Sequence, residues 1–209
     1  MAVTTILSDL GNVVVNYDNQ KVYRTFASLS GRTPEQVHDI LFGKDRNGDY
    51  LIARYSSGQI SSKQFHCAFL HSLGLCGSIA AHQAYQAGFC DVFTPNQPVV
   101  DLWRRLRRQG LTLTAVTNVE PIRFDWLRRL GIIDLFDHCL TSFEERLLKP
   151  SEEFMVRALD RSGAKAEETI FVDDLAANLG PAATLGIITH QYVDDAGLES
   201  FLRAQGVLP

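Results

Sequence analysis

Regular alternation between helical and strand-like segments in the second half of the chain is the strongest constraint on its fold. Four amphipathic segments with helical periodicity alternate with four short segments rich in β-branched residues. The helical segments are residues 99–110, 122–131, 152–163 and 178–186, and the strand-like segments are residues 111–118, 138–142, 169–174 and 187–192. This alternation is typical of a parallel sheet covered by helices on both faces. We therefore predict a doubly wound, Rossmann-like α/β sheet, with residues 4–8 as its first strand.

A purely helical pattern interrupts this alternation between residues 17 and 94. Two capping boxes, at Thr33 and at Ser61, are typical of helix starts. Parallel sheets accept such insertions in their connections, and this one is as large as a small domain. We therefore predict a helical cap domain at residues 17–94, inserted after the first strand of a catalytic core formed by residues 1–16 and 95–209.

The composition narrows the classes of partner. A net charge of −4 gives no electrostatic reason to expect nucleic acid or an anionic membrane. Residues 67–90 lack charged side chains, but His, Gln and Gly interrupt the apolar residues too often for a lipid-facing helix. Four cysteines without paired spacing favour free thiols, and the N-terminus lacks the pattern of a signal peptide. We expect a cytoplasmic protein, a monomer or homodimer, that binds neither nucleic acid nor membranes.

Polar residues follow the strand-like segments at the points where these end. They are Asp9, Thr117, Asn118, Asp173 and Asp174, with Lys149 before a helix. The carboxyl ends of parallel strands meet on one rim of the sheet, so we expect these residues to converge. Converging carboxylates repel one another unless a cation lies among them, and few hard oxygen ligands favour Mg²⁺. A lysine, a hydroxyl, a carboxamide and backbone N–H groups beside that ion predict a phosphate site, with Asp9 as nucleophile.

Four short motifs resemble, in order, those of the haloacid dehalogenase-like superfamily: "DLGNV" from residue 9, "VTN" from 116, "KP" from 149 and "VDDLAAN" from 172. The first motif is most similar to that of small sugar-phosphate phosphatases, and the helical insertion matches the position of the family's smaller cap. The resemblance implies a Mg²⁺-dependent phosphatase that hydrolyses a small phosphorylated metabolite, such as a hexose 1-phosphate, through a phospho-aspartate on Asp9.

The same resemblance implies how the phosphoryl group is held. Asp9 is the residue that becomes phosphorylated. Thr117 and Lys149 bind the transferring phosphoryl group and count with Asp9 as catalytic. Leu10, Gly11 and Asn118 are expected to complete the phosphate site.

The metal site follows from the resemblance in a similar way. The expected ligands are the Asp9 carboxylate, the backbone oxygen of Gly11 and the Asp174 carboxylate. Asp173 is expected to act through water or from a second layer. Asn178 stands where many members of the superfamily carry a second acid, and we expect it in the same second layer.

Gly11 is a departure from the pattern, because most phosphatases of this superfamily carry a second Asp there as general acid and base. Loss of such a group typically lowers the reaction rate by a factor of about 10²–10⁴. A leaving group that needs little help, such as the anomeric oxygen of a sugar 1-phosphate, is our preferred explanation. Asp18 is a candidate replacement, although its position favours a helix cap. Slow turnover is the third explanation.

Two other functions stay open at this stage. A 2-haloacid dehalogenase also lacks the second Asp, although its carboxylate substrate would be repelled by Asp173 and Asp174. A weakly active or inactive phosphate-binding protein would also account for Gly11. Release of chloride from 2-chloropropionate in EDTA would favour the dehalogenase.

Overall fold

A computed structural model describes residues 2–44 and 48–209. Its centre is a five-stranded sheet of order β5-β4-β1-β6-β7, and every neighbouring pair is parallel. The strands are β1 (Thr5–Ser8), β4 (Thr112–Thr117), β5 (His138–Thr141), β6 (Thr169–Asp173) and β7 (Ile188–Gln191). The predicted doubly wound parallel sheet is therefore confirmed, and its first strand lies in the middle.

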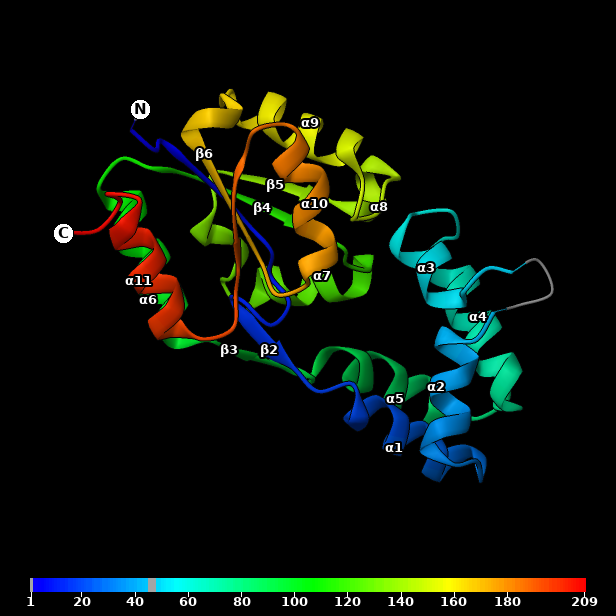
Figure 1. The fold of residues 1–209 in the computed structure, drawn as a ribbon. Coiled ribbons are helices and arrows are strands. Elements are labelled where there is room, and N and C mark those ends of the chain that lie inside the picture. Colours follow the sequence, from blue (N-terminus) through cyan, green and yellow to red (C-terminus); the bar gives the residue numbers. More distant parts are fainter. Residues whose placement is uncertain (1, 45–47) are drawn as a thin grey trace.

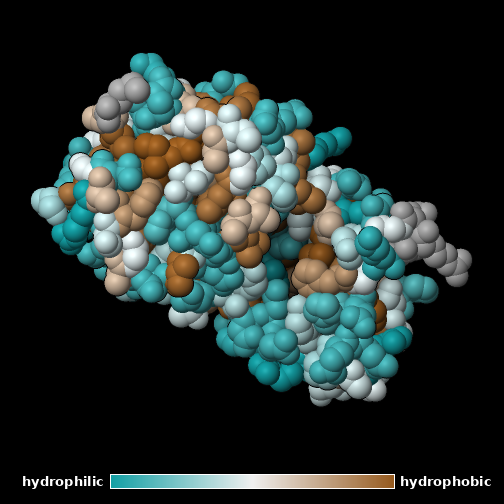
Figure 2. Space-filling model, viewed as in Figure 1, coloured by the Kyte–Doolittle hydropathy of each residue, from teal (hydrophilic) through white to brown (hydrophobic). Residues whose placement is uncertain are grey.

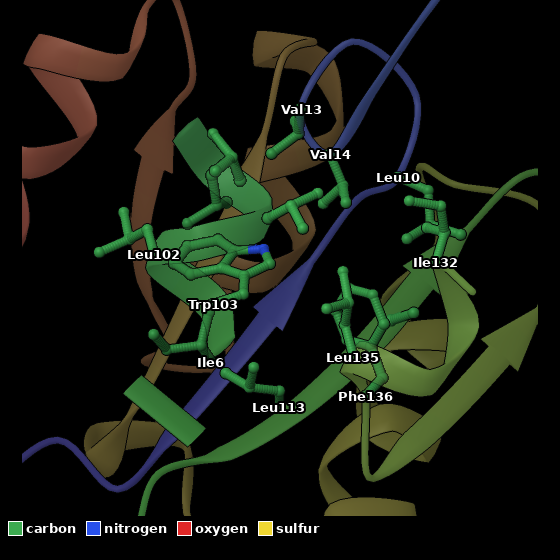
Figure 3. Packing of buried hydrophobic residues seen from close by; sticks show 14 of the residues in the cluster. Ile6, Leu10, Val13, Val14, Leu102, Trp103, Leu113, Ile132, Leu135 and Phe136 are labelled. Carbon is green, nitrogen blue, oxygen red and sulfur yellow. The ribbon is translucent and has the colours of Figure 1, made fainter. Parts of the chain in front are cut away.

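Helices cover both faces of this sheet (Figure 1). One face packs against α6, α7 and α11, around a buried cluster that includes Ile6 and Trp103. Figure 3 shows the Trp103 ring among apolar side chains of this cluster. The other face packs against α9 and α10 through residues such as Leu7, Phe154 and Phe171. These helices are α6 (Gln97–Arg108), α7 (Pro121–Arg129), α9 (Glu152–Ser162), α10 (Ala176–Thr184) and α11 (Asp195–Ala204), and a short helix α8 (Ser142–Glu145) follows β5.

The inserted segment forms a separate group of helices beside the sheet (Figure 1). These are α1 (Gln20–Ser30), α2 (Pro34–Phe42), α3 (Leu51–Ser56), α4 (Ser62–Leu73) and α5 (Ile79–Cys90), and they share their own buried cluster. The chain enters them along β2 (Val15–Tyr17) and returns along β3 (Phe93–Pro95), which pair as an antiparallel ribbon. The sequence pattern did not predict this ribbon. Within the described residues, no helix combines the length and apolarity that crossing a membrane requires.

Candidate active site

The backbone at the end of β1 fixes the position of Asp9. The Asp9 N–H donates to the Val172 carbonyl (2.9 Å), which extends the pairing of β1 with β6 by one residue. The Ser8 hydroxyl donates to the Asp9 carbonyl (2.7 Å) and accepts a hydrogen bond from the Trp103 indole (3.2 Å). Both Ser8 and Trp103 are fully buried, so the sheet and α6 together hold the backbone that carries this carboxylate.

Lys149 joins two of the predicted carboxylates. Its Nζ lies 2.9 Å from Asp9 Oδ1 and 2.7 Å from Asp173 Oδ2. The Lys149 side chain is 2% exposed, Asp9 is 12% exposed and Asp173 is completely buried. Buried charges persist only when they are paired and hydrogen-bonded, and this arrangement meets that condition for the lysine.

The pKa values of this pair reflect its burial. Burial opposes a charge on Lys149, but the Asp9 and Asp173 carboxylates outweigh it and raise the pKa of the lysine. Burial also raises the pKa of Asp9; Lys149 offsets part of that increase and Asp173 adds to it. Lys149 therefore stays cationic at neutral pH, and the Asp9 carboxylate is in surroundings that disfavour its charge.

Asp173 and Asn178 form the layer behind this pair. Asp173 Oδ1 accepts hydrogen bonds from the Leu175 N–H (2.9 Å) and from Asn178 Nδ2 (2.9 Å), while its Oδ2 takes Lys149. Both oxygens of Asp173 are thus committed to protein donors. This geometry makes Asp173 a residue that orients Lys149, and makes Asn178 one that orients Asp173.

Asp174 lies closer to the surface and faces the first motif. Its Oδ2 accepts a hydrogen bond from Asn12 Nδ2 (3.0 Å), which links the loops after β1 and β6. Asn12 has a left-handed backbone (φ 52°), a conformation that Asn tolerates better than most residues. Asn12 was not among the residues predicted from the sequence, although its position within "DLGN" was a usable signal.

Asn118 holds the loop that carries the lysine. Its Nδ2 donates to the Lys149 carbonyl (3.0 Å), and its Oδ1 accepts from the Lys149 N–H (2.8 Å). The amide is used in both directions to hold the Lys149 backbone, which leaves one N–H of Nδ2 outside these two bonds. The Leu10 N–H is likewise engaged, since it donates to Asp9 Oδ1 (2.8 Å). Thr117 ends β4 with a buried side chain that lines the same pocket.

The donor set fits a divalent cation. Asp9, Asp173 and Asp174 each offer a carboxylate oxygen, and these oxygens lie within 4.8 Å of one another. Both oxygens of Asp173 already accept hydrogen bonds from protein groups. Two carboxylate oxygens of this cluster, Asp9 Oδ2 and Asp174 Oδ1, accept none from the described residues. A single lysine leaves the three carboxylates with a net negative charge, which a hard divalent ion would offset.

A pocket of about 280 Å³ opens from these residues toward the inserted helices. Figure 2 shows the molecule hollowed between the sheet domain and these helices, with apolar residues around the hollow. Phe42, Ile52 and Ser56 line the pocket from the insertion. A volume at the low end of that of small-molecule sites indicates a small ligand.

Glu120 and Arg123 form a polar wall of this pocket that no sequence motif indicated. They begin α7, are nearly buried and pair at 3.6 Å. Glu120 Oε1 accepts a hydrogen bond from the Ser56 hydroxyl (3.1 Å), and Arg123 Nη2 donates to Asn19 Oδ1 (2.6 Å). Residues of the core and of the insertion therefore meet through this wall.

Tyr17 and Asp18 have different surroundings at the end of β2. Tyr17 lines the pocket; burial raises the pKa of its phenol, and the carboxylates of Asp174 and Asp9 add to the increase. Asp18 does not line it: Asp18 Oδ1 accepts from the Gln20 N–H (2.9 Å), and Oδ2 pairs with Arg24 at 3.4 Å on the exposed surface. The sequence favoured Asp18 as the helix cap, but the N-cap of α1 is Asn19, and Asp18 binds the N–H of the first helical residue from one position earlier.

Comparisons with known proteins show which family and fold this chain is similar to. The family model described as haloacid dehalogenase-like hydrolase matches residues 3–186. A sesquiterpene phosphatase from Aspergillus oryzae is 31% identical over 68% of this chain and 71% of its own length. A ribulose-1,5-bisphosphate 5-phosphatase from Halopiger xanaduensis is 28% identical over 89% of this chain and 83% of its own. The crystal structure of a HAD family enzyme from Bacteroides thetaiotaomicron, in complex with magnesium and inorganic phosphate, shares the fold (TM-score 0.79, 21% identity, 92% and 95% of the two chains).

Proposed function

Because the chain belongs to the haloacid dehalogenase-like hydrolase family, we propose that it is a Mg²⁺-dependent phosphatase in which Asp9 is the nucleophile. The observation that carries this proposal is the difference in hydrogen bonding between the two oxygens of the Asp9 carboxylate. Its Oδ1 is held by Lys149 and by the Leu10 N–H, while no described residue donates to its Oδ2. A carboxylate fixed at one oxygen and open at the other, at the bottom of a pocket, is suited to nucleophilic attack.

Phosphoryl transfer then takes place in two steps. The Asp9 carboxylate forms a bond to phosphorus while the bond from phosphorus to the leaving oxygen breaks, and the electron pair of that bond stays on the leaving oxygen. Water next attacks the phosphorus, and the bond to Asp9 breaks to restore the carboxylate and release phosphate. Lys149 offsets the negative charge of the phosphoryl group, and the Thr117 hydroxyl donates to one of its oxygens.

Asp9, Asp174 and the backbone oxygen of Gly11 would hold the Mg²⁺. Bound there, the ion would act as a Lewis acid and reduce the repulsion between two anions, the carboxylate and the phosphate. Asp173 and Asn178 keep Lys149 oriented from behind. The helices at residues 17–94 would act as a cap that limits water and substrate size.

A small phosphorylated metabolite, such as a hexose 1-phosphate, is the substrate class that we propose. The pocket volume, the buried polar wall of Glu120 and Arg123, and relatives named as phosphatases of small metabolites all support this class. A 2-haloacid dehalogenase is less well supported, because without a metal ion its carboxylate substrate would be repelled by the cluster of Asp9, Asp173 and Asp174.

The test is phosphate release from a panel of sugar phosphates and p-nitrophenyl phosphate, with Mg²⁺ and with EDTA. We expect wild-type activity to require Mg²⁺, and Asp9→Asn to lose at least about 10³-fold in kcat/KM, since the nucleophile is gone. Asp160→Asn, the same change at an exposed position on α9, is the matched control and should behave as wild type. Full activity of Asp9→Asn would exclude the phospho-aspartate. Chloride release from 2-chloropropionate in EDTA would replace the phosphatase by the dehalogenase.

A further inference from the structure

Tyr17 occupies the space that a side chain at position 11 would take. A Cβ atom on Gly11 would lie 3.0 Å from Tyr17 Cε1 and 3.6 Å from Cδ1. Gly11 has no positive φ, so its backbone does not demand a glycine. The glycine instead makes room for the aromatic ring. The same Cβ position is 4.0 Å from Asp9 Oδ2, and Tyr17 and Asp9 line the same pocket.

The Tyr17 hydroxyl is available for a ligand. Within residues 2–44 and 48–209 no group makes a hydrogen bond to it, and Tyr17 is 39% exposed where it lines the pocket. The Phe93 ring packs edge-on against it (centroids 6.2 Å apart), which restricts the ring without engaging the hydroxyl. The position of the ring is therefore set by β2, β3 and the missing side chain at Gly11.

Ser56 and Glu120, two other polar residues of the pocket, are already engaged. The Ser56 hydroxyl bonds to the Ile52 carbonyl and to Glu120. The Glu120 carboxylate also pairs with Arg123, so it serves as an acceptor for two protein donors. Tyr17 differs from these groups in offering an unengaged O–H in the pocket that Asp9 also lines.

We propose that the Tyr17 hydroxyl protonates the leaving oxygen when Asp9 takes the phosphoryl group, an inference that rests on the proposed function. As the bond from phosphorus to the leaving oxygen breaks, that oxygen keeps the electron pair and receives the phenol proton, so the product leaves as an alcohol. The resulting phenolate regains a proton from water before the next turnover. Burial and the nearby carboxylates raise the pKa of Tyr17, so the phenol keeps its proton at neutral pH and has it available when the strongly basic alkoxide oxygen forms.

The experiment compares substrates whose leaving groups differ in their need for a proton. An alkyl phosphate releases a strongly basic alkoxide, whereas p-nitrophenyl phosphate releases a weak base that departs unprotonated. Tyr17→Phe keeps the ring against Gly11 and removes only the hydroxyl. We expect its kcat/KM for the alkyl phosphate to fall about 10²-fold or more, and for p-nitrophenyl phosphate to stay within about threefold of wild type.

Controls separate this role from a structural one. Tyr50→Phe changes a tyrosine that is equally exposed (39%) but does not line the pocket, and both substrates should react as with wild type. The p-nitrophenyl phosphate rate of Tyr17→Phe reports, on the same preparation, that the site is intact. In wild type alone, kcat/KM should vary little along a series of alkyl and aryl phosphates of increasing leaving-group pKa.

Equal losses of Tyr17→Phe on both substrates, or no loss on the alkyl phosphate, would overturn the proposal. A leaving-group-dependent loss in Glu120→Gln but not in Tyr17→Phe would also overturn it and assign the proton to the polar wall. These outcomes leave the phosphatase itself intact. Failure of the proposed function would instead appear as no Mg²⁺-dependent phosphate release by wild type, or as Asp9→Asn retaining wild-type rates on every substrate.

Discussion

Lys149 illustrates how a single residue determines both the stability and the chemistry of this site. It is the cation between the buried Asp9 and Asp173. Lys149→Met leaves these carboxylates without a cation, and removing one member of a buried ion pair typically costs about 3–5 kcal/mol. We expect a loss of this size in the free energy of unfolding, measured with urea in EDTA. Lys165→Met, at a lysine whose side chain is 69% exposed, should change it by less than about 0.5 kcal/mol.

The stability of Lys149→Met should also depend on pH in a different way from that of wild type. Burial already raises the pKa of Asp9 above its unfolded value, and removal of Lys149 would raise it further. An acid with a raised folded-state pKa destabilises the fold fully above that pKa, and the destabilisation decreases as the pH falls toward the lower unfolded-state pKa. The deficit of Lys149→Met relative to wild type should therefore shrink as the pH is lowered from about 8 to about 5. A deficit that stays constant over this range would contradict the role of Asp9 as the uncompensated charge.

Individual site residues were predictable where they stand directly at the ends of apolar strands. Asp9 and Asp173 follow β1 and end β6, and their burial alone indicated a compensating cation. Tyr17 was not predictable, because a three-residue strand has no periodic signal and its partner β3 is distant in sequence. The engagement of the Asn118 amide by Lys149 also depends on loop geometry that spacing does not encode.

At the scale of elements, a second contact attaches the inserted helices to the core. The end of α3 lies against α8, where the Ser142 hydroxyl donates to the Ser56 carbonyl (2.6 Å). Gly58 follows with φ +67°, and a Cβ there would lie 2.3 Å from the Phe143 carbonyl oxygen. The close approach of these two backbones therefore requires glycine at position 58.

Gly58→Ala tests this contact against a glycine with the same backbone but no neighbour. Gly74 ends α4 with φ +74°, and no atom lies within 4 Å of the place that a Cβ would take there, so Gly74→Ala should cost only the left-handed strain, roughly 1–2 kcal/mol. Gly58→Ala should cost about 1–3 kcal/mol more in urea unfolding and raise KM, because Ser56 lines the pocket. Equal costs for the two variants would show that α3 does not depend on this approach.

Long elements were predicted better than short ones. The capping boxes at Thr33 and Ser61 begin α2 and α4 as expected, since the cap signal and the helical period agree there. The ribbon of β2 with β3 and the short helix α8 were missed, because each is too short to show a period. Their positions are set by tertiary contacts.

For the molecule as a whole, the sheet and the inserted helices are stabilised by different hydrophobic clusters. One cluster fills each face of the sheet, and a third lies among α1–α5. The alternation of segments predicted the parallel sheet, but the order β5-β4-β1-β6-β7 depends on how each crossover turns, which no single segment encodes. Asp9, Asp173 and Asp174 form an acidic rim at the carboxyl ends of the central strands β1 and β6. Repulsion among these carboxylates therefore affects the stability of the entire fold.

A thermal melt links that rim to the whole molecule. Without metal, the carboxylates of Asp9, Asp173 and Asp174 lie close together, so Asp174→Asn should melt at or above the wild-type temperature because one like charge is removed. With Mg²⁺ at about 100 times its Kd, wild type should gain about 2.7 kcal/mol, a rise in Tm of about 5–10 °C for a chain of this size. Asp174→Asn should lose most of this gain, whereas Asp160→Asn should keep it. The two conditions thus predict opposite rankings of wild type and Asp174→Asn, and an equal gain in both proteins would mean that the ion binds elsewhere.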